Sequence, residues 1–340
     1  MPAPILIVGQ GLAGSLLAWE FERAGIDFEI VDRGHAEASS RIGAGIINPI
    51  TGQRLVKSWR IDELLPQATK AYREMEGALG IALLRPMRVR RFFSDDRERR
   101  IFAEKQLRGE LAPYVSAGTA NTDGFWIEGG AQLDSAALIA AMRARLQGAG
   151  RLREATAMLG EVCERHDLVI LCTGIFLQQT RVFDFAGLQA AKGETLTVAT
   201  ESDLREDVIL NDGHWVLPLG PRVARVGATF QPGVNDREPT TEGRAELEES
   251  ARRLLRGGFT VTAHEVGLRM TSPDKHPIVG RSPSDSRLGI FNGLGSKGAL
   301  LAPGLARQWV NHLTEAVPFE PAVDVKRFAN RTGRNSPAKA

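Results

Sequence analysis

The chain has 340 residues, of which 43% are hydrophobic and 25% are charged, and its formal net charge at pH 7 is +2. This length allows a large core and predicts a division into two domains. The charge balance excludes a global attraction to nucleic acid or to a membrane surface. Only two cysteines occur, Cys163 and Cys172, which excludes a disulfide framework and a cysteine-rich zinc site, so we expect no metal and a reducing compartment.

The first predicted element is a short buried strand, Ile5–Val8, that leads into a glycine-rich turn. Gly9, Gly11 and Gly14 have the spacing G-x-G-x-x-G. In that motif the first glycine allows a tight turn, the second lets the backbone approach a pyrophosphate, and the third lets the helix pack on the strand. The spacing predicts a dinucleotide site, and the alternative is a glycine-rich turn in an α/β unit that binds nothing.

A helix with apolar residues at helical spacing follows, and Gly25 is placed to end it. A second strand then ends at Asp32, about twenty residues beyond the glycines, where the motif expects a carboxylate on a ribose 2′-hydroxyl. Because a 2′-phosphate would be repelled at this position, Asp32 argues against NADP. The N-terminal stretch has no basic region and no apolar run reaches about 18 residues, so we expect no signal peptide, no membrane span and a cytoplasmic location.

Signals of the nucleotide domain recur far along the chain. "LDSAALIAAMRARLQGAG" predicts a helix capped by Asp134 or Ser135, "DLVILCTG" predicts a buried strand, and the end of the chain again gives strand, glycine loop and helix. The segments between them are more polar and strand-rich. We therefore predict an α/β fold with a discontinuous Rossmann-like FAD-binding domain (1–80, 131–185 and 265–325), an inserted mixed β-sheet substrate domain (81–130 and 186–264) and a disordered tail (326–340).

Several motifs together carry a resemblance that extends over nearly the whole chain. They are, in order, "VGQGLAG…VDRG", "SSRIGAGIINP", "LVILCTG", "GATF", "GLRMTSPDKHPIVG" and "GLGSKGALLAP". The sequence resembles the FAD-dependent D-amino-acid oxidase superfamily, which includes glycine oxidase, sarcosine oxidase and the oxidase half of the tRNA-modifying enzyme MnmC. The glycine-serine-basic-glycine loop before an Ala-Pro pair is most similar to the MnmC half. FAD domains of this kind are assembled from several segments, which favours FAD over NAD here.

The resemblance implies where the cofactor binds. The loop "GLGSKG" would lie along the flavin pyrimidine, where the following helix and Lys297 would stabilise negative charge on the reduced ring; the alternative for Lys297 is a solvated surface lysine. "SSR" would bond phosphate or ribose, unless it is a plain loop. The cofactor-binding residues that we expect are Gly9, Gly11, Leu12, Ala13, Gly14, Asp32, Arg33, Ser39, Ser40, Arg41, Ala44, Gly45, Ile46, Val162, Thr173, Gly174, Gly293, Leu294, Gly295, Ser296, Lys297 and Gly298.

The resemblance also implies catalytic residues. Related oxidases clamp the substrate carboxylate with an arginine in a Gly-Leu-Arg sequence, which is Arg269 here; the alternative is a structural arginine paired with Glu265. Gly267 stands where sarcosine-oxidase relatives tether flavin through a cysteine, so FAD is expected to bind non-covalently. Arg225 would replace a lysine that activates dioxygen, although a strand-surface role is the alternative. His214 is a possible acid or base beside Trp215, which would form the pocket wall.

The leading functional hypothesis is an FAD-dependent enzyme that oxidises the C–N bond of an amine or amino acid by hydride transfer to flavin N5. Water would hydrolyse the imine, and dioxygen or another electron acceptor would reoxidise the flavin. The first alternative is an MnmC-like oxidase acting on a carboxymethylaminomethyl uridine in tRNA, which the basic cluster of Arg85, Arg88, Arg90 and Arg91 and the basic tail "NRTGRNSPAKA" favour. The second alternative is a non-enzymatic redox sensor that holds FAD.

Overall fold

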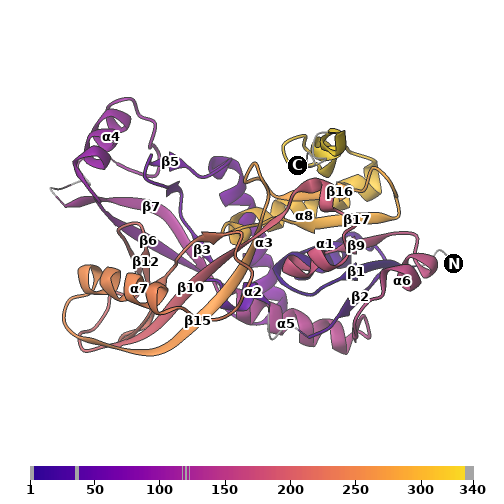
Figure 1. The fold of residues 1–340 in the computed structure, drawn as a ribbon, viewed down its shortest axis with the longest axis horizontal. Coiled ribbons are helices and arrows are strands. Elements are labelled where there is room, and N and C mark those ends of the chain that lie inside the picture. Colours follow the sequence, from indigo (N-terminus) through magenta and orange to yellow (C-terminus); the bar gives the residue numbers. More distant parts are fainter. Residues whose placement is uncertain (1–3, 35–37, 117, 119–120, 122, 334–340) are drawn as a thin grey trace, which may run out of the picture.

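The structure is a computed structural model that describes residues 4–34, 38–116, 118, 121 and 123–333. Its strands form two large sheets: a six-stranded sheet towards the right of Figure 1, near the N-terminus, and a nine-stranded sheet towards the left. The chain passes between the two sheets several times, because each sheet takes strands from separate parts of the sequence. The predicted α/β class, with a discontinuous parallel domain and a mixed second sheet, is confirmed.

The six-stranded sheet contains the two strands of the first motif. All its neighbouring strands pair in parallel except β16, which is antiparallel to β17 at one edge. The order across the sheet is β16 (Ile278–Arg281), β17 (Leu288–Asn292), β9 (Val169–Leu171), β1 (Ile5–Val8), β2 (Phe28–Asp32) and β8 (Leu152–Glu154).

Helices cover both faces of this sheet, since successive side chains of a strand point to opposite faces. Ile7 and Ile170 face the larger core, whereas Leu6 and Leu171 face a smaller one. The larger core lies under α1 (Leu12–Ala24), α3 (Ile61–Leu79), α5 (Ser135–Gly148) and α8 (Gly298–Glu315). The smaller core lies under α6 (Leu159–Arg165) and the 3-10 helices η1 (Gly174–Gln179), η2 (Asp184–Ala186) and η3 (Val325–Gly333).

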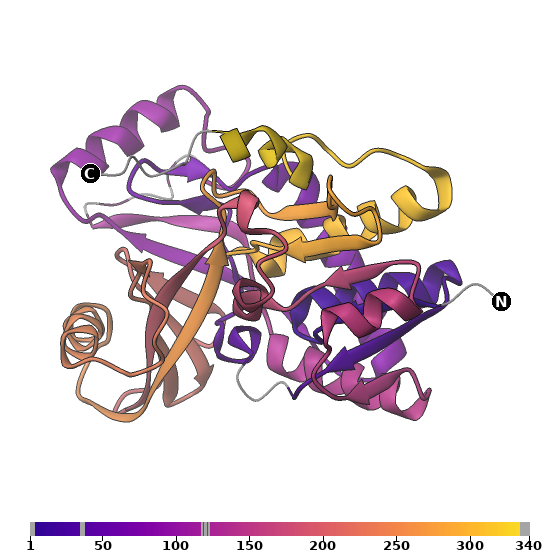
Figure 2. The same cartoon turned by 45° about the vertical axis from the view of Figure 1, so that its right-hand side comes forward.

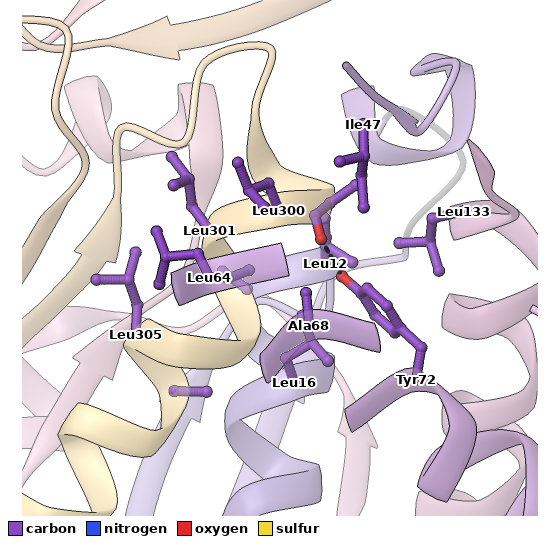
Figure 3. Packing of buried hydrophobic residues seen from close by; sticks show 14 of the residues in the cluster. Leu12, Leu16, Ile47, Leu64, Ala68, Tyr72, Leu133, Leu300, Leu301 and Leu305 are labelled. Atoms are coloured by element: carbon purple, nitrogen blue, oxygen red, sulfur yellow. Dashed lines mark hydrogen bonds between the residues drawn. The ribbon is translucent and has the colours of Figure 1, made fainter. Parts of the chain in front are cut away.

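Local sequence explains where the helices begin and end. Gly25 ends α1 in the left-handed conformation, with φ of 68°, as predicted. Asp134 caps α5 by accepting a hydrogen bond from the Ala137 N–H at 2.9 Å, which decides between the two predicted caps. Figure 3 shows how α3 packs on the N-terminal part of α8: the Tyr72 hydroxyl donates to the Ala299 carbonyl at 2.8 Å.

The second sheet is mixed, with β6 and β11 parallel and its other pairs antiparallel. Its order is β14 (Gln231–Pro232), β10 (Gln189–Thr200), β13 (Val223–Gly227), β12 (Trp215–Gly220), β11 (Val208–Asn211), β6 (Leu84–Phe92), β7 (Gly124–Leu133) and β3 (Ile46–Ile47). The ninth strand, β15 (Phe259–Thr271), also pairs with β10. The remaining elements are α2 (Ser39–Ile42), β4 (Ile50–Thr51), β5 (Val56–Lys57), α4 (Asp96–Leu107) and α7 (Thr241–Leu254).

Two details differ from the predicted organisation. Strand β15 begins before residue 265 and β7 continues past residue 130, so both strands cross boundaries that the sequence suggested. The tail was expected from residue 326, but η3 runs to Gly333 and its Phe328 is 3% exposed, because this aromatic ring packs into the smaller core. Residues 334–340 lie outside the described part of the chain. No described helix is long and apolar enough to cross a membrane.

Candidate active site

An elongated cavity of about 670 Å³ lies where the carboxyl ends of β1, β2 and β9 meet β10 and β15 of the second sheet. This volume is within the range of small-molecule and cofactor sites. Residues 8–9, 11–13 and 31–34 line one part of the cavity, and Gly193, Thr195, Trp215 and residues 267–270 line another. The cavity therefore joins the predicted dinucleotide turn to the predicted substrate residue.

The three glycines of the motif have distinct steric roles. Gly9 has φ of 98°, and a Cβ there would lie 2.7 Å from the Cys172 carbonyl oxygen. A Cβ at Gly14 would lie 1.9 Å from the Gly9 carbonyl oxygen, so only glycine lets α1 pack this closely on the turn. A Cβ at Gly11, by contrast, would meet only the Ser40 hydroxyl at 3.7 Å. The backbone at Gly11 thus faces the cavity, where α1 begins without an acidic residue in its first turn.

Asp32 lines the same part of the cavity and is 7% exposed. Its carboxylate accepts hydrogen bonds from the Gln10 N–H at 2.8 Å, from the Gly34 N–H at 3.0 Å and from Arg143 Nη1 at 3.0 Å. Arg143 also donates to Glu154 at 2.7 Å. This network fixes the carboxylate at the end of β2, and a carboxylate with this many donors has room for one further partner such as a ribose hydroxyl.

Most of the expected cofactor residues do line the cavity: Gly9, Gly11, Leu12, Ala13, Asp32, Arg33, Ser39, Ser40, Ala44, Gly45, Ile46, Thr173, Gly174, Leu294, Gly295, Ser296 and Gly298. Gly14, Arg41, Gly293 and the side chain of Lys297 are not among its lining residues. Val162 is a correction of another kind: it lies on α6 with its side chain in the smaller core, and residues 155–159 line the cavity instead.

Two buried hydroxyls on the cavity wall provide a test of whether a polar ligand fits. Thr173 Oγ1 and Thr195 Oγ1 have no hydrogen-bond partner among the described residues. Buried polar groups are normally paired, so unpaired ones at a cavity mark the contact region of a polar ligand. Together with the glycine turn, the open helix N-terminus and the Asp32 carboxylate, they fit the FAD that the resemblance implies.

Arg269, on β15, is half-buried at the other part of the cavity. Its guanidinium lies directly on the backbone of Gly193, where a Cβ would come within 2.4 Å of Nη1 and Nη2. Nη1 donates to the Thr229 carbonyl at 3.2 Å, and no carboxylate in the described chain pairs with Arg269. Glu265, the predicted alternative partner, instead lies 3.5 Å from Arg225. Burial lowers the pKa of Arg269, since the charged form is partly desolvated.

The reverse face of β10 holds this arrangement in place. Lys192 and Glu194 flank Gly193 and point to the opposite face, where both are almost fully buried. Lys192 Nζ donates to Asp236 at 2.6 Å, and the Glu194 carboxylate accepts from the Thr240 hydroxyl at 2.8 Å at the start of α7. The Glu194 N–H also donates to Thr229 Oγ1 at 2.9 Å, and the Thr229 N–H donates to the Glu194 carbonyl at 3.2 Å, so β10 holds the residue whose carbonyl accepts from Arg269.

Three other predicted catalytic residues are not brought to the cavity. His214 Nε2 contacts Glu246 of α7 at 2.9 Å, on the outer side of the large sheet, where Figure 2 shows α7 away from the six-stranded sheet. Arg225 donates to the Ile42 carbonyl at 3.1 Å, and Ile42 lines the cavity whereas Arg225 does not. Lys297 is half-buried next to Lys275, and burial together with that neighbouring charge lowers its pKa.

Trp215 does line the cavity, as the sequence suggested for a pocket wall, and Gly193 and Thr195 are functional positions that sequence reasoning missed. Gly193 could have been found from the sequence, because a glycine in the interior of a strand often marks the close approach of another group. Cys172 also lines the cavity, under the Gly9 turn, and burial raises the pKa of its thiol. No cluster of three or more histidine, cysteine or acidic side chains in the described chain could hold a metal ion.

All four arginines of the basic cluster contact other groups of the chain, and two of them pair with acids. Arg91 is 6% exposed and donates from Nε to Glu98 at 3.1 Å, and Arg88 donates from Nε to Glu128 at 2.9 Å. Arg85 and Arg90 donate to the Pro218 carbonyl and to Asn121. The two ion pairs, Arg88 with Glu128 and Arg91 with Glu98, reduce the positive charge that the cluster presents to a phosphate backbone.

Comparisons with known proteins agree with this geometry. The family model described as FAD dependent oxidoreductase matches residues 4–311. A glycine oxidase of Pseudomonas aeruginosa is 23% identical in an alignment that covers 97% of this chain and 99% of the relative. The tRNA 5-methylaminomethyl-2-thiouridine biosynthesis bifunctional protein MnmC of Idiomarina loihiensis is 25% identical over 95% of this chain but only 58% of its own length. The crystal structure of glycine oxidase from Geobacillus kaustophilus superposes with a TM-score of 0.76 at 20% identity, covering 96% of this chain and 98% of that one.

Proposed function

The chain belongs to the family of FAD-dependent oxidoreductases, and on this premise we propose that it oxidises the C–N bond of a small amine that carries a carboxylate, as an amino acid does. The observation that carries the proposal is Arg269: a half-buried guanidinium at the cavity wall, seated on bare backbone and without a carboxylate partner in the described chain. A planar guanidinium is the side chain best suited to bind a carboxylate through two hydrogen bonds. The glycine oxidase relatives act on such a substrate by name.

In the proposed reaction the carbon next to the amine nitrogen loses a hydride and the nitrogen loses a proton, so that the amine becomes an imine, which water hydrolyses. When bound, FAD supplies the two-electron acceptor for this oxidation. Arg269 binds the substrate carboxylate and fixes which C–H bond faces the cofactor. Trp215 covers the sheet side of the site and excludes water. Dioxygen or another electron acceptor takes up the electrons.

The residues that would hold FAD are the Gly9–Ala13 turn for the pyrophosphate, Asp32 for the adenosine ribose, and Thr173, Gly174, residues 294–296 and Gly298 along the ring system. We propose that the cofactor is held non-covalently. Gly267 offers no thiol, and the Cys172 thiol is kept protonated by burial, so it is a poor nucleophile. Acid precipitation should release all flavin into the supernatant, and flavin that stays on the denatured chain would contradict this.

The tRNA alternative receives no specific support from the site. Two of the four arginines that suggested it, Arg88 and Arg91, are paired with acids, and the other two donate to neutral groups of the chain. The redox-sensor alternative lacks an observation in its favour, given the family and the substrate-type arginine. A cytoplasmic location, which the two unpaired cysteines favour, stays part of the proposal.

The test is anaerobic reduction of the FAD-loaded protein by amines offered in pairs, one member with a carboxylate and one without it. Loss of the oxidised flavin absorbance with the carboxylate-bearing members, and at least tenfold slower loss with the others, is expected. Equal rates within every pair would remove the role of Arg269, and no reduction by any amine would remove the proposed function.

A further inference from the structure

Beside Arg269, the cavity-facing side of the large sheet has glycine at several positions. On this face Gly193 of β10 and Gly267 of β15 line the cavity, and they lie directly opposite each other in the antiparallel register. Thr195 lies opposite Gly227, and Gly227 in turn lies opposite Trp215 of β12. Glycines on three neighbouring strands thus remove side chains from this face of the sheet around Thr195, Trp215 and Arg269.

Two long side chains, those of Arg269 and Trp215, lie against the glycines of this face. The Arg269 guanidinium rests on Gly193, as described above, and the Trp215 indole rests on Gly227. A Cβ at Gly227 would lie 2.6 Å from Cζ2 and 2.8 Å from Cη2 of the indole. Since any other residue at position 227 would push the ring away, the glycine fixes how far the indole reaches into the cavity.

The distance between Gly193 and Gly227 limits the space between the guanidinium and the indole. Gly193 and Gly227 are diagonal neighbours on adjacent antiparallel strands, which places them about 7 to 8 Å apart. When the guanidinium on Gly193 binds the substrate carboxylate, there is room for only a few further substrate atoms before the substrate meets the indole on Gly227. The indole offers a flat apolar surface to that end of the substrate.

We propose that Trp215 is the specificity-determining residue of the site, which limits the size of the groups carried at the amine-bearing end of the substrate. The substrates are then carboxylate-bearing amines with small substituents on the nitrogen and the adjoining carbon, such as glycine and its N-alkyl derivatives with short chains. This inference rests on the proposed function, because it takes the substrate carboxylate to be on Arg269.

The test compares the wild type with Trp215→Phe and Trp215→Ala across glycine and its N-methyl, N-ethyl and N-benzyl derivatives. For the wild type, kcat/KM falls steeply as the substituent grows. Each Trp215 variant should raise the value for the largest substrate relative to the smallest by about tenfold or more, the scale of discrimination by an apolar pocket wall. The phenylalanine variant preserves an aromatic ring on the sheet, so the test does not depend on the alanine variant folding.

Trp126→Phe is the matched control, because Trp126 is also a half-buried tryptophan of the large sheet but does not line the cavity. It should keep the wild-type size profile. Identical profiles in the wild type and both Trp215 variants would overturn the inference while leaving the proposed function intact.

A second readout avoids turnover. Dissociation constants for acetate, propionate and phenylacetate are measured on the FAD-loaded proteins by the change in the flavin absorption band. Affinity should fall with size in the wild type and depend less on size in the Trp215 variants. If the acid series is unchanged by the variants, the inference fails. If no amine reduces the flavin while the acid series behaves as expected, the proposed function fails and only the size limit on the bound carboxylic acid is retained.

Discussion

Replacing Arg269 by alanine removes the group that is proposed to bind the substrate carboxylate. Only one of the guanidinium N–H groups has a hydrogen-bond partner in the described chain, the Thr229 carbonyl, so the others are available to a ligand. A charge-assisted hydrogen bond contributes about 1.5 to 3 kcal/mol, and loss of a two-bond contact in a partly desolvated site should therefore cost about 3 kcal/mol or more. That corresponds to a decrease in kcat/KM on the order of 100-fold.

The assay is anaerobic stopped-flow reduction of the bound flavin with an amino acid and with its decarboxylated amine. For Arg269→Ala we expect a weaker substrate affinity and a lower reduction rate together, because one contact supplies both binding and alignment. Arg269→Lys should recover only part of the loss, since an ammonium group cannot form the planar two-bond contact. Arg222→Ala, which changes an exposed arginine in the turn between β12 and β13, is the control. If Arg269→Ala and the wild type discriminate equally between acid and amine, the reasoning is refuted.

Further substitutions test the supporting structure. Gly193→Ala should displace the guanidinium and lower affinity for the carboxylate-bearing substrate about tenfold or more with FAD retained, whereas Gly77→Ala, an exposed helical position with open space around it, should not; equal kinetics of the two would contradict the steric argument. Asp32→Ala should weaken FAD binding by roughly 2 to 4 kcal/mol in a fluorescence titration, and unchanged affinity would mean that Asp32 does not hold the ribose. Burial opposes ionisation of Asp274, but hydrogen bonds from Arg327 and its neighbours lower its pKa well below the ordinary value. The stability it contributes is therefore present above about pH 4 and lost as the pH falls, so Asp274→Asn should make urea unfolding less dependent on pH below 4, and an unaltered pH profile would speak against the ion pair.

The sequence was most informative where the determining contacts are local. The turn after β1 was predicted from glycine spacing because Gly9 and Gly14 contact each other within a short stretch of chain, and a steric requirement of this kind is visible in six residues. Arg269 was identified only through the resemblance, and the structure adds why it is available: its neighbour on β15, Glu265, is directed to Arg225.

Positions that depend on strand register were beyond the sequence. His214 and Trp215 are adjacent, so they point to opposite faces of the sheet, and the pattern did not show which face would meet the cavity. Gly193 acquires its role only when β10 pairs with β15 and brings the guanidinium across it. Val162 was displaced from the predicted site because the chain after β8 lines the cavity before α6 begins.

The central claim is that this chain breaks the C–N bond of a carboxylate-bearing amine at the cost of reducing its flavin. The most direct measurement is a single turnover without oxygen, in which the FAD-loaded enzyme is mixed with its best amino-acid substrate, the flavin absorbance is recorded, and the quenched mixture is analysed for the released amine and the carbonyl product. The account predicts one equivalent of each product for every flavin reduced. Reduced flavin with the C–N bond of the substrate intact, or cleavage without flavin reduction, would contradict it.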